Sequence, residues 1–203
     1  DERDPRYKLL ESQRLLAVEQ LRAAGEDEVL RRRHAHALAA AFAAAWDERW
    51  SGRIGMEPWA SRLLPDASNA RDAIAWARAA GEPALVVAIA ATLFHALPRS
   101  AHPERMALAD LCEALAEQLV PGPLQLRAWE AAVRPLYHRQ QQQSLAVGGK
   151  AVALARALDR AAADRWPLYQ ALSGWICAAS VVAQPSAQAL REALAELGTL
   201  EDP

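Results

Sequence analysis

Residues that favour β-structure are scarce in this chain of 203 residues. It contains 10 Val, 4 Ile, 12 aromatic residues and 9 Gly, against 48 Ala and 28 Leu. β-Branched and aromatic side chains favour strands, whereas Ala and Leu have high helix propensities. The composition therefore argues against an all-β or doubly wound α/β fold. Disorder is also disfavoured, because 52% of the residues are hydrophobic and the net charge is only −2.

Cysteine and an excess of one charge are lacking as well. Cys112 and Cys177 are far apart, which predicts neither a disulfide framework nor a zinc site and favours a reducing, cytoplasmic location. The 23 basic and 25 acidic residues form no basic stripe of the kind that binds phosphates. The dense run Arg31–Arg33 follows the acidic run Glu26–Glu28, which indicates a solvated helix face with paired charges. We expect no direct binding of nucleic acid.

No signal peptide or membrane span is predicted. The chain begins Asp-Glu-Arg-Asp-Pro-Arg and lacks an initiator methionine, which suggests a piece of a longer protein. The apolar stretch at 83–98 is shorter than the roughly 20 residues that a bilayer requires. The uncharged stretch at 166–190 carries Gln, Ser and Pro residues that are costly in hydrocarbon. No association with a membrane is therefore expected.

Glycine, proline and capping residues divide the chain into about ten predicted helices. Gly25 and Gly81 are expected to stop two of them, and Asp66, Asp164 and Ser186 to cap three others. Helices are predicted near residues 12–24, 26–50, 66–80, 83–98, 100–119, 124–138, a stretch ending near 159, 164–183 and 186–197, with a short apolar turn at 59–64. Two points stay open: Pro135 either kinks or splits its helix, and Gly148-Gly149 either breaks a helix or lies inside a weakened one.

Two of these helices have patterns that predict their surroundings. The helix at 26–50 carries large side chains at every fourth position: Leu30, His34, Leu38, Phe42, Trp46 and Trp50. A four-residue step overshoots the 3.6-residue turn, so this row winds partway round the helix and must touch more than one neighbour. Ala37, Ala41 and Ala45 lie beside the row and are the small residues predicted to allow close approach of helices. The helix opening at Pro83 is apolar almost all round, which predicts a central, buried position.

A weak internal repeat favours an array of helical hairpins over a simple antiparallel bundle. Residues 151–158 read Ala-Val-Ala-Leu-Ala-Arg-Ala-Leu, and residues 187–194 read Ala-Gln-Ala-Leu-Arg-Glu-Ala-Leu. The offset of 36 residues is close to the 34-residue period of tetratricopeptide hairpins. The predicted fold is therefore all-α, a degenerate tetratricopeptide-like α-solenoid of antiparallel hairpins. We divide it into an N-terminal helical segment, 1–64, and a helical-repeat region, 65–203, which together form one continuous unit.

Two segments resemble a known family. One begins Arg6-Tyr-Lys-Leu-Leu-Glu-Ser-Gln-Arg-Leu-Leu-Ala-Val-Glu-Gln-Leu-Arg-Ala-Ala-Gly-Glu26 and continues with Arg31-Arg-Arg-His34. It resembles the region just after the nucleotide-binding module in bacterial signal-transduction ATPases of the STAND class, which include winged-helix and LuxR-type transcriptional regulators. The other is Asp66-Ala-Ser-Asn-Ala-Arg-Asp-Ala-Ile-Ala-Trp-Ala77, which resembles the Asn-x-Arg-x-Ala-x-x-Trp helix that opens the tetratricopeptide-like arm of these proteins.

The resemblance implies the helical sensor or interaction arm of a bacterial transcriptional regulator. Its partners would be a small-molecule inducer or a protein, together with the parent's own ATPase and DNA-binding domains. No Gly-x-x-x-x-Gly-Lys-Ser/Thr occurs, and Gly148-Gly149-Lys150 lacks both the first glycine and the Ser/Thr, so no ATP binding is expected here. The alternative function is a structural scaffold that mediates only self-association, as a homo-oligomer, or interdomain packing.

No motif for catalysis is present, and we predict a protein that is not an enzyme and needs no cofactor or metal. His34 and His36 are two residues apart and face different sides of a helix, so they cannot share a metal ion. Neither a Gly-x-Ser-x-Gly elbow nor a His-Glu-x-x-His pair occurs.

Aromatic residues are the candidates for binding. Trp46, Trp50, Trp59 and Trp76 are interpreted as core residues that pack between adjacent helices. In the repeat-like region, aromatic side chains and one histidine would form a small-molecule or peptide pocket if they face the concave side of the array. These candidate site residues are Trp129, Tyr137, His138, Trp166 and Tyr169.

Overall fold

The described part of the chain is helical, as the composition predicts. The computed structural model describes residues 10–50, 53–98, 100, 102–159, 166–181, 191 and 195–196. No strand occurs among these residues. The helices are α1 (Glu11–Ala23), α2 (Asp27–Trp50), α3 (Met56–Leu63), the 3-10 turn η1 (Leu64–Asp66), α4 (Ala67–Ala79), α5 (Pro83–Ala96), α6 (His102–Ala116), α7 (Pro123–Arg139), α8 (Gln141–Asp159) and α9 (Trp166–Val181).

Three expectations fall on other parts of the chain. The predicted caps Asp164 and Ser186 and the repeat at 187–194, apart from residue 191, lie outside the described residues. So does most of the predicted helix at 186–197. The all-helical class is confirmed, while the count of about ten helices and the tetratricopeptide arrangement stay predictions.

Glycine stops α1 and α4 in the predicted way. Gly25 has φ +72° and Gly81 has φ +70°, a left-handed conformation that a side chain would disfavour. After α1, the Gly25 N–H donates to the carbonyl of Arg22 at 3.1 Å and the Glu26 N–H to that of Leu21 at 2.9 Å. This pair of bonds satisfies the last carbonyls of the helix and turns the chain sharply into α2.

Long helix α2 packs chiefly against α4 and α5 and also contacts α1 and α3. The predicted row is partly confirmed, because Phe42 and Trp46 are buried while Leu30 and His34 are exposed. The prediction for the small residues is wrong at two positions, because Ala37 and Ala41 are exposed, whereas the third, Ala45, is partly buried and packs against the core. The buried alanines are Ala35 and Ala39. Positions 35, 39, 42 and 46 advance by steps of four and three, which keep to one face of a 3.6-residue helix, whereas a row with steps of four only drifts off it.

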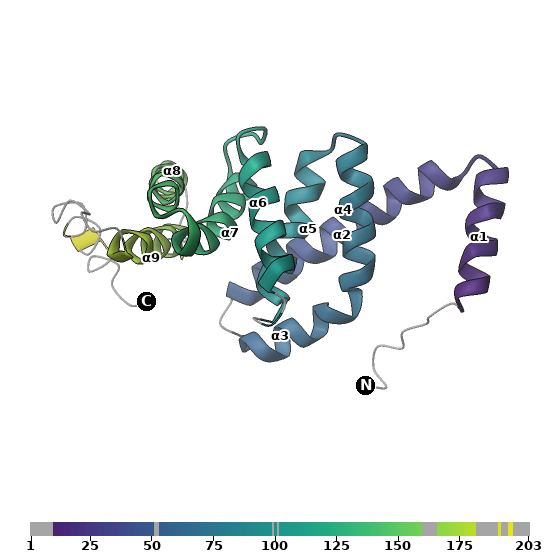
Figure 1. The fold of residues 1–203 in the computed structure, drawn as a ribbon, viewed down its shortest axis with the longest axis horizontal. Coiled ribbons are helices and arrows are strands. Elements are labelled where there is room, and N and C mark those ends of the chain that lie inside the picture. The colour runs from purple at the N-terminus through teal and green to yellow at the C-terminus, as the bar shows by residue number, and fades with distance from the viewer. Residues whose placement is uncertain are drawn as a thin grey trace.

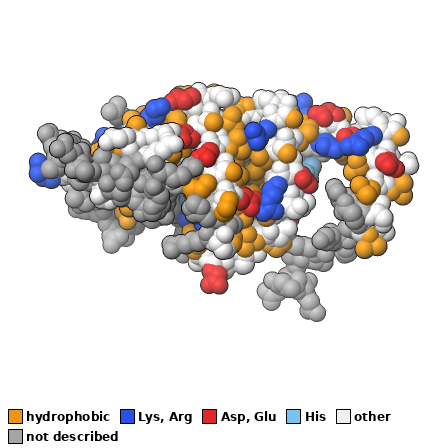
Figure 2. Space-filling model, viewed as in Figure 1, with side chains coloured by type: hydrophobic (Ala, Val, Ile, Leu, Met, Phe, Trp, Pro, Cys, Tyr) orange, Lys and Arg blue, Asp and Glu red, His pale blue; other side chains and the backbone are white. Residues whose placement is uncertain are grey.

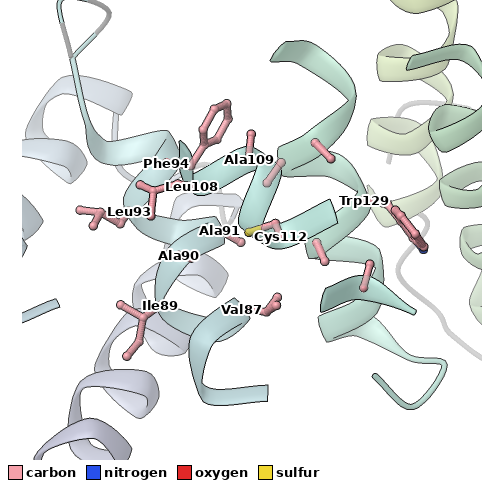
Figure 3. Close-up of a cluster of buried hydrophobic side chains, with 14 of the residues drawn as sticks. Val87, Ile89, Ala90, Ala91, Leu93, Phe94, Leu108, Ala109, Cys112 and Trp129 are labelled. Atoms are coloured by element: carbon pink, nitrogen blue, oxygen red, sulfur yellow. The ribbon is translucent and has the colours of Figure 1, made fainter. Parts of the chain in front are cut away.

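Helix α5 is the centre of the molecule, as its apolar sequence predicts. It packs against α2, α3, α4, α6 and α7, and Figure 3 shows its side chains meeting those of α6 around Cys112. The buried Thr92 hydroxyl lies 3.2 Å from the Ala88 carbonyl oxygen of its own helix and 3.2 Å from that of Phe42 in α2. This contact joins the middle of α2 to the core without leaving the hydroxyl unsatisfied.

The later helices pack in chain order, α5 on α6, α6 on α7, α7 on α8 and α8 on α9, as Figure 1 shows. Pro135 lies inside α7, which is not split there and continues to Arg139. The break comes instead at Gln140, whose φ of −141° and ψ of 73° are not helical and separate α7 from α8.

The glycine pair lies inside α8 and does not break it. A Cβ atom at Gly148 would stand 2.7 Å from Cδ1 and 3.3 Å from Cα of Trp175 in α9. Gly149 is more open, with its nearest such neighbour, the Trp175 Nε1 atom, at 3.9 Å. The absence of a side chain at Gly148 therefore lets α8 and α9 approach closely.

The family-like motif at the start of α4 makes structural contacts. Asp66 occupies the N-cap position, but its side chain makes no capping bond to the helix; the Asn69 amide donates to it at 3.4 Å. Arg71 makes a two-pronged ion pair with Glu104 of α6, at 2.6 and 3.0 Å, and this hydrogen bonding raises the pKa of Arg71. The Trp76 indole donates to Glu28 of α2 at 3.1 Å.

Candidate functional site

A small cavity with polar and apolar walls lies where five helices converge. Its volume is about 200 Å³, and the wall is built from α2, α5, α7, α8 and α9. The lining residues are Arg49, His95, Glu130, Val133, Ala151, Tyr169, Gln170, Ala171, Ser173 and Gly174. The cavity thus combines a cationic, an anionic and several hydroxyl or amide groups with a short apolar wall.

Arg49 reaches the cavity from the last turn of α2, where two tryptophans hold it. Its guanidinium carbon lies 5.9 Å from the ring centroid of Trp46 and 5.5 Å from that of Trp59. Trp59 is itself fixed, because its indole N–H donates to the carbonyl of Ala45 at 2.6 Å and its side chain is buried. Stacking on aromatic faces stabilises a cation and limits the orientations of the guanidinium.

The remaining polar walls come from α5, α7 and α9. His95 packs edge-on against two aromatic rings, with centroids 5.3 Å from Trp46 and 4.9 Å from Phe94. Glu130 lies on α7, near enough to Arg127 to favour its charged form. Tyr169, Gln170 and Ser173 follow one another on the first two turns of α9.

A second arginine packs against the same tryptophan. The Arg127 guanidinium carbon is 5.1 Å from the Trp46 centroid, and its Nη2 atom pairs with Asp47 at 2.7 Å. Burial lowers the pKa of Arg127, and the neighbouring Asp47 and Glu130 carboxylates partly offset this effect. Trp46 therefore has cationic side chains at two sides, Arg49 and Arg127, and the second of these has the Asp47 and Glu130 carboxylates near it.

The five predicted site residues do not come together in one pocket that the structure describes. Tyr169 is 42% exposed and lines the cavity. Trp129 is buried in the core at 4% exposure, beside α8, with the Lys150 ammonium 4.9 Å from its ring (Figure 3). The side chains of Tyr137, His138 and Trp166 lie outside those that the structure describes.

Sequence reasoning missed Arg49 and Glu130, and found no role for His95. Arg49 ends an alanine-rich helix one turn after Trp46, and Glu130 follows Trp129 directly. A charged residue beside tryptophans near a helix end is the signal that was available. The convergence of five helices, however, is a property of the packing and leaves no local pattern.

A second feature is an apolar face on α1 and the start of α2. Five large apolar side chains there are exposed: Leu10 at 67%, Leu15 at 54%, Leu16 at 57%, Val29 at 51% and Leu30 at 37%. Helix α1 packs chiefly against α2 and stands apart from the other helices, at the right-hand end of the molecule, where Figure 2 shows hydrophobic side chains on the surface. Several large exposed apolar side chains at one end of a molecule are typical of an interaction surface.

Two arginines of the basic run beside this face are paired, as predicted. Arg31 bonds to Asp27 at 2.9 Å within the helix, and Arg32 lies 3.7 Å from Glu82 at the start of α5. Arg22 of α1 also approaches Asp27, at 3.8 Å. Exposed ion pairs of this kind add little to the free energy of unfolding. They do balance the positive charge of these arginines beside the apolar face.

Another hollow lies between α2 and α3, bordered by Ala41, Ala44 and Ala45 and by Trp59. Across it, Arg62 and Glu48 pair with each other at 2.8 Å. The ion pair of this hollow thus joins the two helices. The five-helix cavity has the wider range of groups, with charged, hydroxyl and amide side chains.

The described residues contain no cluster of three or more His, Cys, Asp or Glu side chains that would hold a metal ion. Within the same ranges, none of the helices has the length and apolar character that a membrane crossing demands. No protein-family model, no curated protein and no solved structure matches the chain.

Proposed function

We propose that this chain is a non-enzymatic helical arm of a bacterial transcriptional regulator of the STAND class. In this proposal it docks on a neighbouring domain of the same polypeptide and couples that domain to a bound inducer. The resemblance of residues 6–34 and 66–77 to this family supports the assignment, as does the all-helical fold.

The observation that carries the proposal is the apolar face of α1. Leu15 and Leu16 are more than half exposed on a helix whose chief neighbour is α2. Covering such side chains removes apolar area from water, worth about 25 cal/mol per Å². Because the face lies in the segment that resembles the region directly after the nucleotide-binding module, the proposed occupant is that module.

Two experiments test the docking. The complete reading frame should encode a Gly-x-x-x-x-Gly-Lys-Ser/Thr loop before residue 1, and a frame without one contradicts the assignment. Hydrogen exchange then compares this chain with the longer protein. We expect amides of α1 to exchange at least tenfold more slowly in the longer protein, whereas equal rates in both would contradict docking at this face.

A double variant separates docking from the alternative function, a scaffold for self-association. Leu15→Gln with Leu16→Gln keeps helix propensity and removes the apolar face; Val120→Gln, at an exposed apolar position in the loop after α6, is the matched control. Light scattering of the chain alone should show a monomer for all three proteins. A concentration-dependent dimer that only the double variant abolishes would favour the scaffold.

A further inference from the structure

We propose that the joint between α1 and α2 is a hinge with two forms. One is the bent form of this structure, in which exposed apolar side chains of both helices gather at one end of the molecule (Figure 2). The other is a straight form, in which residues 11–50 make one continuous helix. The hinge is a property of this chain alone, whereas its role in docking rests on the proposed function.

Gly25 is the residue that interrupts the helix. Its φ of +72° ends α1 and turns the chain, and a Cβ atom there would meet nothing within 4 Å. Residues 20–30 read Gln-Leu-Arg-Ala-Ala-Gly-Glu-Asp-Glu-Val-Leu, without proline. A straight helix would pair the N–H groups at 27–29 with the carbonyls at 23–25, groups that lie at helix ends in the bent form. The bent form therefore depends on the left-handed conformation of one glycine, and straightening adds backbone hydrogen bonds.

Packing does little to fix the angle of this joint. None of the α1 side chains that the structure describes is buried, and the most covered of them, Val18 and Leu21, are only partly so. Helix α1 makes sparse contacts with α2. The ion pair across the turn, between Arg22 and Asp27, is 3.8 Å long and lies at the surface, where such pairs add little to stability. Straightening therefore takes little apolar area out of contact.

Gly81, which stops α4, shows a fixed joint of the same backbone type. Its φ is +70°, and a Cβ atom there would also meet nothing within 4 Å. Pro83 follows at the first position of α5 and excludes a straight helix, because proline lacks the N–H and clashes with the preceding turn. Helices α4 and α5 also pack closely on each other. At the equivalent position after Gly25, α2 begins with Asp27, which is compatible with both forms.

Straightening would disperse the apolar face. In a continuous helix Leu15 and Val29 would stand about 21 Å apart along the axis, at 1.5 Å per residue. Three charged residues would lie between them on the same side, at steps of three and four: Glu19, Arg22 and Glu26. A domain that covers both Leu15 and Val29 therefore binds the bent form better and shifts the population towards it.

The distance between two spin labels on the 203-residue chain tests the hinge. Ser12→Cys on α1 and His36→Cys on α2 carry the labels at exposed positions, with Cys177→Ser to remove the exposed native thiol. A continuous helix places residues 12 and 36 about 36 Å apart, and the bent form places them closer. We expect mainly the shorter distance in this labelled chain. Adding Gly25→Ala should raise the straight population at least tenfold, because alanine disfavours positive φ and favours a helix interior.

Two further variants are the controls. Gly81→Ala makes the same change at a joint that cannot straighten, so it should lower Tm and leave the label distance unchanged. Asp27→Pro, added to Gly25→Ala, reproduces the position of Pro83 and should abolish the straight population. The hinge is overturned if Gly25→Ala keeps the shorter distance, or gives a broad distribution without a maximum at about 36 Å. Persistence of that maximum in the chain with Asp27→Pro overturns it as well.

The longer protein separates the hinge from docking. With the same labels, docking should reduce the straight population of Gly25→Ala severalfold relative to the chain alone. An unreduced population would show that the docked module does not select the bent form. If α1 amides exchange equally fast in both proteins while Gly25→Ala still lengthens the distance in the chain alone, docking at this face fails and the hinge stands.

Discussion

Gly148 and Gly149 are neighbours in one helix, but they differ in what a methyl group would meet. In an exposed helix interior, replacing Gly with Ala stabilises by about 1 kcal/mol. At Gly148 the new Cβ would lie 2.7 Å from Trp175, so α8 and α9 must separate, and overpacking costs about 1–3 kcal/mol. We expect Gly148→Ala to lower the free energy of unfolding by about 1–2 kcal/mol and Gly149→Ala to leave it unchanged or raise it. Urea unfolding measures both, and a stabilised Gly148→Ala would contradict the close approach.

The two cysteines should differ in reactivity. Cys112 is buried between α5 and α6, and burial raises its pKa to about 12, whereas Cys177 is exposed on α9. Because the thiolate is the reactive form, a thiol reagent at pH 8 should label one cysteine in the native protein and the second only after unfolding. Cys177→Ser should remove the rapid phase. Two thiols reacting at the same rate in the native protein would show that Cys112 is accessible.

The same thiol links stability to pH. In the unfolded chain Cys112 ionises near its ordinary pKa of 9.0, while in the folded protein it stays protonated up to about 12. Between these values the unfolded chain holds fewer protons, so the free energy of unfolding falls as the pH rises from 9 to 12. Below pH 9 the thiol contributes no pH dependence. Cys112→Ala should flatten this part of the pH profile, and an unchanged slope would exclude the thiol as its cause.

At the scale of helices, α1 and α5 represent opposite extremes of burial. Leu15 of α1 is 54% exposed, and Leu93 of α5 is fully buried. Leu93→Ala should therefore cost about 2–5 kcal/mol through lost burial and a cavity, and Leu15→Ala about 0.5 kcal/mol or less. Chemical unfolding of this matched pair measures the difference. Similar losses at the two positions would mean that the face of α1 is covered in the chain by itself.

Helix positions were predictable from the sequence because the signals that set them are local. Gly25 and Gly81 stop helices through their own backbone conformation, and the apolar run after Pro83 is buried wherever its neighbours lie. The positions of the close contacts were not predictable in this way. Ala37 and Ala41 were chosen from a row with a strict step of four, yet burial follows the 3.6-residue turn to Ala35 and Ala39.

The candidate site was even less predictable from the sequence, because it is formed by contacts between distant helices. Tyr169 was identified from its aromatic character, and it does line the cavity. Arg49, His95 and Glu130 join it from three other helices, 35 or more residues apart in the sequence. Only the crossing of α2 over α5 and the packing of α9 on α7 bring them together, and no spacing within one helix encodes these contacts.

For the whole molecule, the order of packing predicts an order of local stability. Helix α5 contacts five other helices, while α1 has one substantial neighbour, α2, among the described elements. Local opening requires less free energy where fewer buried contacts are lost. Native-state hydrogen exchange should therefore be slowest in α5, intermediate in α8 and α9, and fastest in α1. Equal protection across all helices would instead indicate a single cooperative unit that includes α1.

Helix α2 has a geometric consequence for signalling. It carries Val29 of the apolar face near one end and Arg49 of the cavity near the other, and its unbroken backbone holds them about 30 Å apart, at 1.5 Å per residue. The contact of Thr92 with Phe42 lies between them. The helix is thus a rigid rod that touches the core partway along its length: a tilt of about 5° about Phe42 would move Val29, roughly 20 Å away, by about 2 Å. A small adjustment around Arg49 would therefore be transmitted to the apolar face through continuous helix, with no loop in between to absorb it.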